Sequence, residues 1–181
     1  MKHQWISLPN QQGFSLIECA VVALVAALFL ALAIPSYNSF LAQKRLRVGT
    51  EELYNYMKLA QAKSFNNHVN IYLSFNTAAA WCYGLSDTAP CSCETSNSCQ
   101  VDGVETVINS TNYSGNALTL STAGFATSGG SPYIQFNGAR GTINASGSVN
   151  FGQSGLQTTI NANTAGLISI CSNNVSGFPS C

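Results

Sequence analysis

The chain has 181 residues, enough for one compact domain with an N-terminal appendage. Seven basic residues balance seven acidic ones, which excludes a general attraction to nucleic acid or to an anionic membrane surface. Only 8% of the residues are charged, against about a quarter in an average protein. No group of residues forms a catalytic constellation, so we expect a protein that is not an enzyme and that uses no cofactor or metal.

The first element along the chain is a long apolar segment. Residues 14–34 read FSLIECAVVALVAALFLALAI and contain one charge, Glu18. As a helix, this segment is long enough to cross a hydrocarbon core of about 30 Å. A polar leader, residues 1–13, carries Lys2 but no acid, which favours a cytoplasmic N-terminus and an exported C-terminal part. We therefore expect a single-pass membrane helix followed by an exported domain.

Glu18 is the unusual residue of this segment. A carboxylate in the middle of a membrane span costs about 2.5–3.5 kcal/mol, and charged residues kept at such places are usually functional. The alternative without a function is that Glu18 lies near the membrane interface and reaches toward water. The residues around it therefore matter for its interpretation.

Residues 13–18, GFSLIE, resemble the cleavage motif of type IV pilins and type II secretion pseudopilins. The resemblance implies that a prepilin peptidase cuts between Gly13 and Phe14 and that the new N-terminal residue is methylated. Glu18 then becomes the fifth residue of the mature chain. Pro35 becomes its twenty-second, where many members of the family have a proline that bends the helix.

Cleavage at this place would leave a positively charged amino group on Phe14. In a helical bundle, Glu18 of one subunit could pair with the amino group of its neighbour. Because an unpaired buried charge costs far more than a paired one, the pair would favour one axial register. The expected partners are other pilin subunits in a filament or tip complex, the inner membrane before assembly, and the prepilin peptidase. The expected final location is the pilus or cell surface.

Three other interpretations explain part of this segment. A secretory signal peptide cut after Ala33, with Ala31 two residues earlier, fits the A-x-A rule. It leaves Glu18 inside the apolar core without explanation. Lipid attachment at Cys19 requires a small residue before the cysteine, and Glu18 is not small. A plain membrane anchor explains neither Gly13 nor Glu18.

The helical pattern continues beyond Pro35, which we expect to bend the helix without ending it. Apolar or small residues recur at spacings of seven, four, three and four, which predicts one buried face of an amphipathic helix that ends at about Asn66. These residues are Leu46, Leu53, Met57, Ala60 and Ser64. The predicted helix covers residues 14–66, with its first part in the membrane and its second part in the domain.

The period changes after residue 67. Residues 69–75 alternate between apolar and polar side chains, as in a half-buried strand. Further short strands are predicted at 80–85, 104–108, 117–121, 133–136, 147–151, 156–160 and 167–171. We expect an α+β, pilin-like fold in which a long N-terminal α-helix packs on antiparallel β-sheets. The expected parts are a leader (1–13), a transmembrane and filament-core helix (14–41) and a globular domain (42–181).

Six cysteines lie outside the apolar segment, and an even number in an exported domain predicts three disulfides. They are Cys82, Cys91, Cys93, Cys99, Cys171 and Cys181. Fifteen pairings are possible, of which a C-terminal loop closed by Cys171 and Cys181 is a natural part. A zinc site from Cys91, Cys93 and Cys99 would lack the usual C-x2-C spacing and a nearby histidine. A catalytic thiol with His68 as its base would lack an orienting third group.

The region beyond residue 66 is most similar to the GspH/FimT-type minor pilins and pseudopilins. The resemblance is carried by residues 59–64 (LAQAKS), by Trp81 shortly before Gly84, and by the segments 134–138 (IQFNG) and 147–151 (GSVNF). It implies a low-copy subunit near the filament tip that helps to initiate assembly. The alternatives are a pseudopilin of a type II secretion system, or a tip subunit that binds DNA or a surface through its disulfide-stapled domain.

Some members of that group bind DNA through an arginine in a Gly-Arg motif near the C-terminal strand. At the corresponding place, residues 166–171 read GLISIC and contain no arginine. Beyond Ser64, Arg140 is the one basic residue against four acidic ones, which makes the net charge of this part −3. Because phosphate contacts supply most non-specific affinity for DNA, we do not expect this subunit alone to bind DNA.

Overall fold

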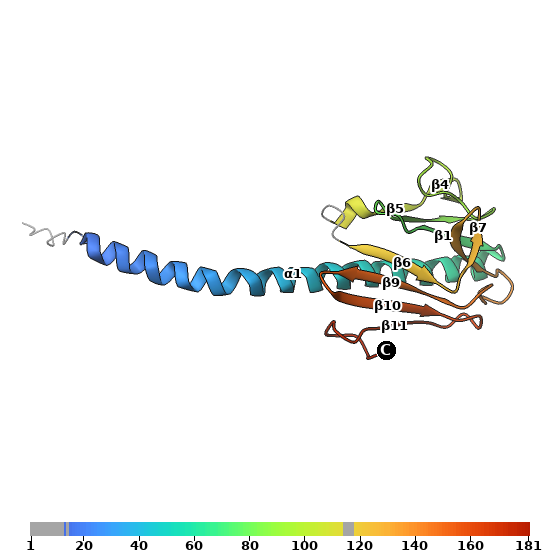
Figure 1. Cartoon of the computed structure of the whole chain (residues 1–181). Helices are drawn as coiled ribbons and strands as arrows, with labels where there is room; N and C mark the ends of the chain where they lie inside the picture. Colours follow the sequence, from blue (N-terminus) through green and yellow to red (C-terminus); the bar gives the residue numbers. More distant parts are fainter. Residues whose placement is uncertain (1–12, 14, 114–117) are drawn as a thin grey trace, which may run out of the picture. The chain divides into compact units, whose positions relative to one another are not determined.

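In the computed structural model of the chain, the described residues are 13, 15–113 and 118–181, and of residues 32–36 only the backbone is described. They fall into two compact units, one that ends at Phe40 and one that begins at Leu41. Among the described residues, the first unit contains the N-terminal part of helix α1 and no strand, and the second contains the rest of the helix and all the strands (Figure 1). The expected α+β architecture, with a long N-terminal helix and antiparallel sheets, is confirmed.

Helix α1 (Leu16–Asn67) has 52 residues, close to the predicted 14–66. It continues through position 35, where proline removes one backbone donor but does not end the helix. The helix stops before His68, whose φ of 55° lies in the left-handed region that terminates many helices. Because the chain turns here, Val69 is 43% exposed and the following strand begins two residues later than predicted, at Ile71.

Within the second unit, one face of α1 is buried in the domain. Its residues at the predicted spacings are each 0% exposed: Leu46, Leu53, Met57, Ala60 and Ser64. The polar member of this face is satisfied, because the Ser64 hydroxyl donates to the carbonyl of Phe136 at 2.9 Å. The amphipathic pattern in the sequence therefore identified the packed face correctly.

The strands of the described part of the chain form three antiparallel sheets, whose arrangement Figure 1 shows. A five-stranded sheet has the order β5-β2-β1-β8-β7, a four-stranded sheet has the order β11-β10-β9-β6, and β3 pairs with β4. The bounds are β1 (Ile71–Asn76), β2 (Cys82–Ser86), β3 (Gln100–Val101), β4 (Val104–Glu105), β5 (Val107–Asn109), β6 (Thr119–Ala123), β7 (Ala126–Ser128), β8 (Ser131–Phe136), β9 (Gly147–Gln153), β10 (Leu156–Ala162) and β11 (Ile168–Cys171). A 3-10 turn, η1 (Ser110–Tyr113), follows β5.

The prediction of one strand at 104–108 was wrong. The segment is divided at Thr106 into β4, which pairs with β3, and β5, which pairs with β2. The amide of Thr106 donates to the carbonyl of Cys99 at 3.0 Å. Its carbonyl accepts bonds from the amide of Leu85 and the hydroxyl of Tyr56, so this residue joins the insert to β2 and to α1. Strands β3 and β7 have two and three residues, too few for an alternating pattern to reveal them.

Aromatic rings form the centre of the domain core. Trp81 is 1% exposed, and its ring stacks on that of Tyr83 with centroids 6.1 Å apart and an interplanar angle of 1°. The same indole lies 5.4 Å from the ring of Tyr113 and 5.5 Å from that of Phe151. Its N–H donates to the carbonyl of Leu118 at 2.6 Å, so the one polar atom of the indole is satisfied.

Three tyrosine hydroxyls lie around this cluster. Burial raises the pKa of Tyr56, Tyr83 and Tyr113, so all three stay protonated at neutral pH. The hydroxyl of Tyr113 donates to the carboxylate of Glu52 on α1, and the buried hydroxyl of Tyr83 lies next to the hydroxyl of Tyr113.

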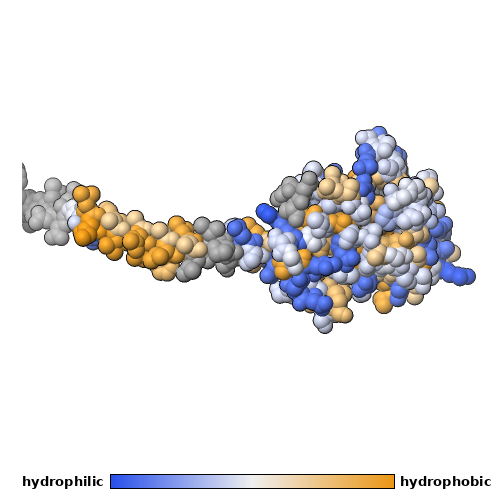
Figure 2. Space-filling view, in the orientation of Figure 1, coloured by the Kyte–Doolittle hydropathy of each residue, from blue (hydrophilic) through white to orange (hydrophobic). Residues whose placement is uncertain are grey.

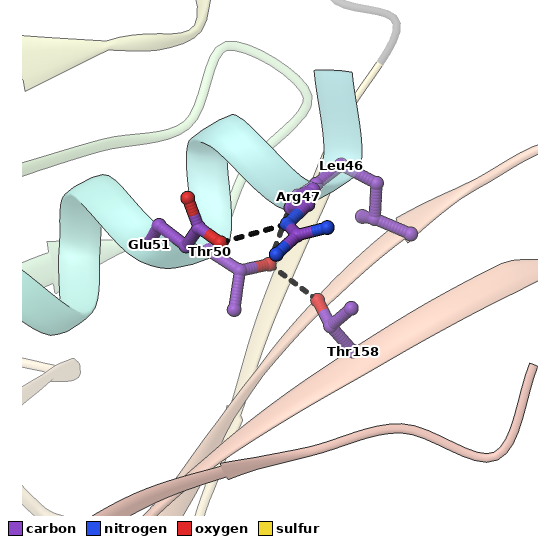
Figure 3. A network of polar contacts seen from close by, with 5 residues as sticks. All are labelled: Leu46, Arg47, Thr50, Glu51 and Thr158. Carbon is purple, nitrogen blue, oxygen red and sulfur yellow. Dashed lines mark hydrogen bonds and ion pairs between the residues drawn. The ribbon is translucent and has the colours of Figure 1, made fainter. Parts of the chain in front are cut away.

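A buried pair of threonines links α1 to the four-stranded sheet (Figure 3). Thr50 is 0% exposed and Thr158, on β10, is 1% exposed. The hydroxyl of Thr50 donates to the carbonyl of Leu46 at 2.7 Å and lies 2.5 Å from the hydroxyl of Thr158. Because each hydroxyl has one hydrogen, Thr158 is the donor in the bond between the two threonines.

Removal of both threonines should therefore cost less than the two single removals added together. Thr50→Val should lower the free energy of unfolding by about 1–3 kcal/mol, because it leaves the Thr158 hydroxyl buried without an acceptor. Thr158→Val should cost less, since Thr50 keeps its bond to Leu46. The double variant should cost less than the sum of the two single variants. Thermal unfolding of the full chain, followed by near-ultraviolet circular dichroism, measures all three, and strictly additive costs would contradict a direct bond.

Candidate assembly site

The N-terminal part of the candidate site is the first turn of α1. The carbonyl of Ser15 accepts hydrogen bonds from the amides of Glu18, at 3.0 Å, and Cys19, at 3.2 Å. Glu18 lies within this turn, so its negative charge is close to the positive end of the helix dipole. Gly13 is exposed, with open space where a side chain would begin. Both residues are therefore accessible in the isolated chain.

Two other residues predicted to take part in processing and assembly are described only in part or not at all. Phe14 lies outside the described residues, and so does the side chain of Pro35. The backbone at Pro35 belongs to α1, which agrees with a proline that is tolerated inside a continuous helix. The leader, residues 1–12, also lies outside the described part of the chain.

The first unit presents an apolar surface to its surroundings (Figure 2). The large side chains involved are all at least 44% exposed: Leu16, Ile17, Val21, Val22, Leu24, Val25, Leu28, Phe29 and Leu30. They follow one another too closely to share one helix face, so the helix is apolar around its circumference. Among the described residues, no helical stretch combines the length and the hydropathy of a membrane span. An apolar surface of this extent marks a place where other molecules bind.

Two interlocked disulfides fix the insert between β2 and β3. Cys82 pairs with Cys93, and Cys91 pairs with Cys99. The amide of Cys91 donates to the buried hydroxyl of Ser74 at 3.0 Å, which attaches the insert to β1. Because all four sulfurs are in disulfides, they are not the thiolates that a zinc site or a catalytic thiol would need.

Gly84 is a position that sequence reasoning did not associate with this insert. A Cβ at Gly84 would lie 2.8 Å from both the Cβ and the Sγ of Cys99 and 3.0 Å from the carbonyl oxygen of Thr106. The Cys91–Cys99 disulfide therefore packs directly on the bare backbone of β2. The signal in the sequence was a glycine inside an apolar strand, which often marks a close approach of another segment.

Gly84→Ala should consequently displace the insert. We expect the free energy of unfolding to fall by about 1–3 kcal/mol, the usual cost of overpacking a core. Gly129→Ala is the control for space, since nothing lies within 4 Å of a Cβ there. Its φ of 57° costs about 1–2 kcal/mol of backbone strain, so the two variants are compared by local hydrogen exchange and not by stability. Hydrogen exchange of the full chain should show faster exchange in residues 84–99 of the Gly84 variant. Unchanged exchange in this segment would show that the insert tolerates the methyl group.

The third disulfide closes the C-terminal segment. Cys171, at the end of β11, pairs with Cys181. Inside this loop, the ring of Phe178 lies 5.7 Å from the guanidinium of Arg47 on α1, which also forms an ion pair with Glu51 at 2.8 Å (Figure 3). The C-terminal loop therefore packs against α1 through Arg47.

The place where a DNA-binding arginine would be expected has a structural role here. The side-chain amide of Gln61, on α1, donates to the carbonyls of Gly141 and Gly166, each at 2.8 Å. A Cβ at Gly166 would lie 2.4 Å from the Gly141 carbonyl oxygen, so this glycine is held tightly under the helix. The acidic residues beyond Ser64 are all in the region of the disulfide insert: Asp87, Glu94, Asp102 and Glu105.

Comparison with known proteins finds one match to the N-terminal segment and others to the fold. Residues 8–34 match the prokaryotic N-terminal methylation motif. The type IV minor pilin FimU of Pseudomonas aeruginosa is 16% identical, with a TM-score of 0.52 over 77% of this chain and 96% of that one. The minor pseudopilin EpsH, from the type 2 secretion system of Vibrio cholerae, is 9% identical, with a TM-score of 0.53 over 71% of this chain and 97% of that one. A comparison with curated proteins finds no match to the chain.

Proposed function

We propose that the chain is a minor pilin that contributes to the assembly or initiation of a type IV pilus at the filament tip, because residues 8–34 match the prokaryotic N-terminal methylation motif and its fold is similar to those of FimU and EpsH. The observation that carries this proposal is the exposed apolar helix in residues 16–31, with Glu18 as its one charged residue and Gly13 just before it. Such a helix has to be covered by lipid or by other helices.

The proposal divides the life of the subunit into two stages. In the first, residues 14–41 hold the subunit in the inner membrane, with the leader (1–13) in the cytoplasm and the domain (42–181) in the periplasm. A prepilin peptidase then cuts between Gly13 and Phe14, and Phe14 is methylated. In the second stage the same apolar helix leaves the lipid and packs among the helices of other subunits. Both environments are apolar, so the transfer does not expose the helix to water.

Glu18 selects the register of that packing in our proposal. Its carboxylate would pair with the amino group of Phe14 on a neighbouring subunit. The position of Glu18 in the first helical turn supports this role, because the carboxylate stays close to the end of the helix at which the neighbour's amine would arrive. A helix shifted by one turn would leave both charges unpaired in an apolar bundle.

The intact mass of the mature chain tests the first stage. Expressed together with a prepilin peptidase, the chain should begin at a Phe14 that carries one methyl group. A chain that begins at Ile34 would instead identify a secretory signal peptide cut after Ala33. A chain that keeps Met1 after exposure to an active peptidase would remove the pilin interpretation of the motif.

A pseudopilin of a type II secretion system is the second candidate, and the likeness of the fold to that of EpsH supports it. Deletion of the chain in its native cell separates the two. We expect loss of surface pili with normal secretion of exoproteins. Loss of secretion with normal pili would assign the subunit to the secretion system.

A further inference from the structure

The outer face of the four-stranded sheet carries a polar surface that the pilin role does not use. Along β6, β9 and β10 the apolar residues point into the core, and the alternate residues face outward. The strand register aligns Ser121 with Asn150 and Asn150 with Thr159. The next row aligns Thr119 with Gly152 and Gly152 with Gln157. Two rows of neutral polar positions therefore cross three strands.

A hollow of about 400 Å³ lies on these rows. Gly152 leaves its floor without a side chain, and a Cβ there would lie 2.8 Å from the Thr119 hydroxyl. Ser154 and Gly155, in the turn between β9 and β10, also line the hollow. A second hollow of about 250 Å³ shares Gln157 and continues toward Thr159. The size of the first is within the range of ligand sites, about 300–1,000 Å³.

Some polar side chains of the first hollow are held in place by hydrogen bonds, and others have unused donors or acceptors. Asn150 is held by a hydrogen bond in which its side-chain oxygen accepts from the Thr159 hydroxyl at 2.8 Å, which leaves its amide N–H₂ group available. The side chains of Ser121 and Gln157 have no hydrogen-bond partner among the described residues, although the backbone of Gln157 is bonded on both sides. The hollow thus offers both donors and acceptors on a rigid sheet.

We propose that this hollow binds a neutral carbohydrate. None of the nine described residues that line it is ionisable, so it has no counter-charge for a phosphate, a carboxylate or an amine. Sugar hydroxyls donate and accept, which matches amides and hydroxyls that do the same. Leu156 is the one large apolar residue of the lining, which argues against an apolar peptide. The lining contains no aromatic ring, so the affinity should be weak and should depend on several hydrogen bonds at once.

Calorimetric titration of the full-length chain tests the proposal. The protein is kept in lauryldimethylamine oxide, because detergents with a sugar head group would compete for the site. The probes are maltohexaose, cellohexaose and chitohexaose, with hexagalacturonate as an acidic sugar and a soluble Ser/Thr/Gly peptide as a neutral non-sugar. We expect saturable binding of at least one neutral hexasaccharide and much weaker binding of the acidic sugar and the peptide.

Two variants locate the binding. Gly152→Val fills the floor and should weaken binding by at least about tenfold. Gln157→Ala removes a free amide without adding volume and should weaken binding about threefold to tenfold, so it decides the question if the valine variant fails to fold. Ser169→Val, exposed on β11 and outside the hollow, is the matched control and should bind like the unmodified chain.

Any of four results would overturn the proposal. These are no binding of a neutral hexasaccharide at millimolar concentration, equal binding of hexagalacturonate, binding of the peptide alone, and unchanged binding by folded Gly152→Val and Gln157→Ala. Near-ultraviolet circular dichroism checks the fold of each variant, because it reports the packing around Trp81.

Discussion

Glu18→Gln should reduce the amount of this subunit in assembled filaments by more than about a hundredfold, while cleavage after Gly13 continues. The reason lies in the proposed pair between the Glu18 carboxylate and the Phe14 amine of a neighbour. Glutamine removes the negative partner and leaves the amine uncompensated among apolar helices. Removal of one partner from a buried ion pair costs about 3–5 kcal/mol, which corresponds to more than two powers of ten in an equilibrium constant.

The measurement is the ratio of the subunit in sheared filaments to the subunit in the membrane, by quantitative immunoblot. The mass of the N-terminus in the same cells shows whether processing is intact. Cys19→Ser is the matched control, because Cys19 is the neighbouring residue, is exposed and is not in a disulfide. Incorporation of Glu18→Gln at the unmodified level would show that Glu18 does not set the register of the bundle.

Trp81→Ala should give the largest loss of stability in the globular unit. The substitution removes a ring that is 1% exposed and that contacts Tyr83, Tyr113 and Phe151. It also leaves the carbonyl of Leu118 without the indole N–H. Truncation of a buried aromatic side chain to alanine costs about 3–5 kcal/mol, a large part of the stability of a small domain.

Far-ultraviolet circular dichroism during thermal unfolding measures this loss in the full chain, because the substitution removes the near-ultraviolet signal of Trp81. Phe65→Ala is the control, because Phe65 is also aromatic but is 52% exposed, and it should change the free energy of unfolding by less than about 1 kcal/mol. Equal costs for the two variants would mean that the aromatic cluster around Trp81 is not the centre of the core.

The long helix and its buried face could be predicted because both follow from local periodicity. Leu46, Leu53 and Met57 repeat with the period of a helix, and a face that is apolar at this period has to be buried somewhere. Most strands were found for the same reason, with bounds that differ by one or two residues. The segment 104–108 was the exception, because its apolar residues pair with two different strands on either side of Thr106.

The candidate site was predictable to different degrees in its two parts. Gly13 and Glu18 stand out in the sequence. Gly13 borders the apolar run, and Glu18 is the one charged residue inside it. The roles of Gly84 and Thr50 were not visible, since each depends on a residue far away in the sequence, Cys99 for one and Thr158 for the other. The disulfide pairing was open for the same reason, because fifteen pairings satisfy the same composition.

The N-terminal segment that dominates the proposed function could therefore be recognised from the amino-acid sequence. Its hydropathy, its one charge and its motif are properties of neighbouring residues, and they hold whatever the rest of the chain does. The three-dimensional fold was needed to establish which strands share a sheet, which cysteines pair, and that the outward positions of β6, β9 and β10 form a neutral hollow over Gly152. Those features are contacts between residues distant along the chain, and no local pattern contains them.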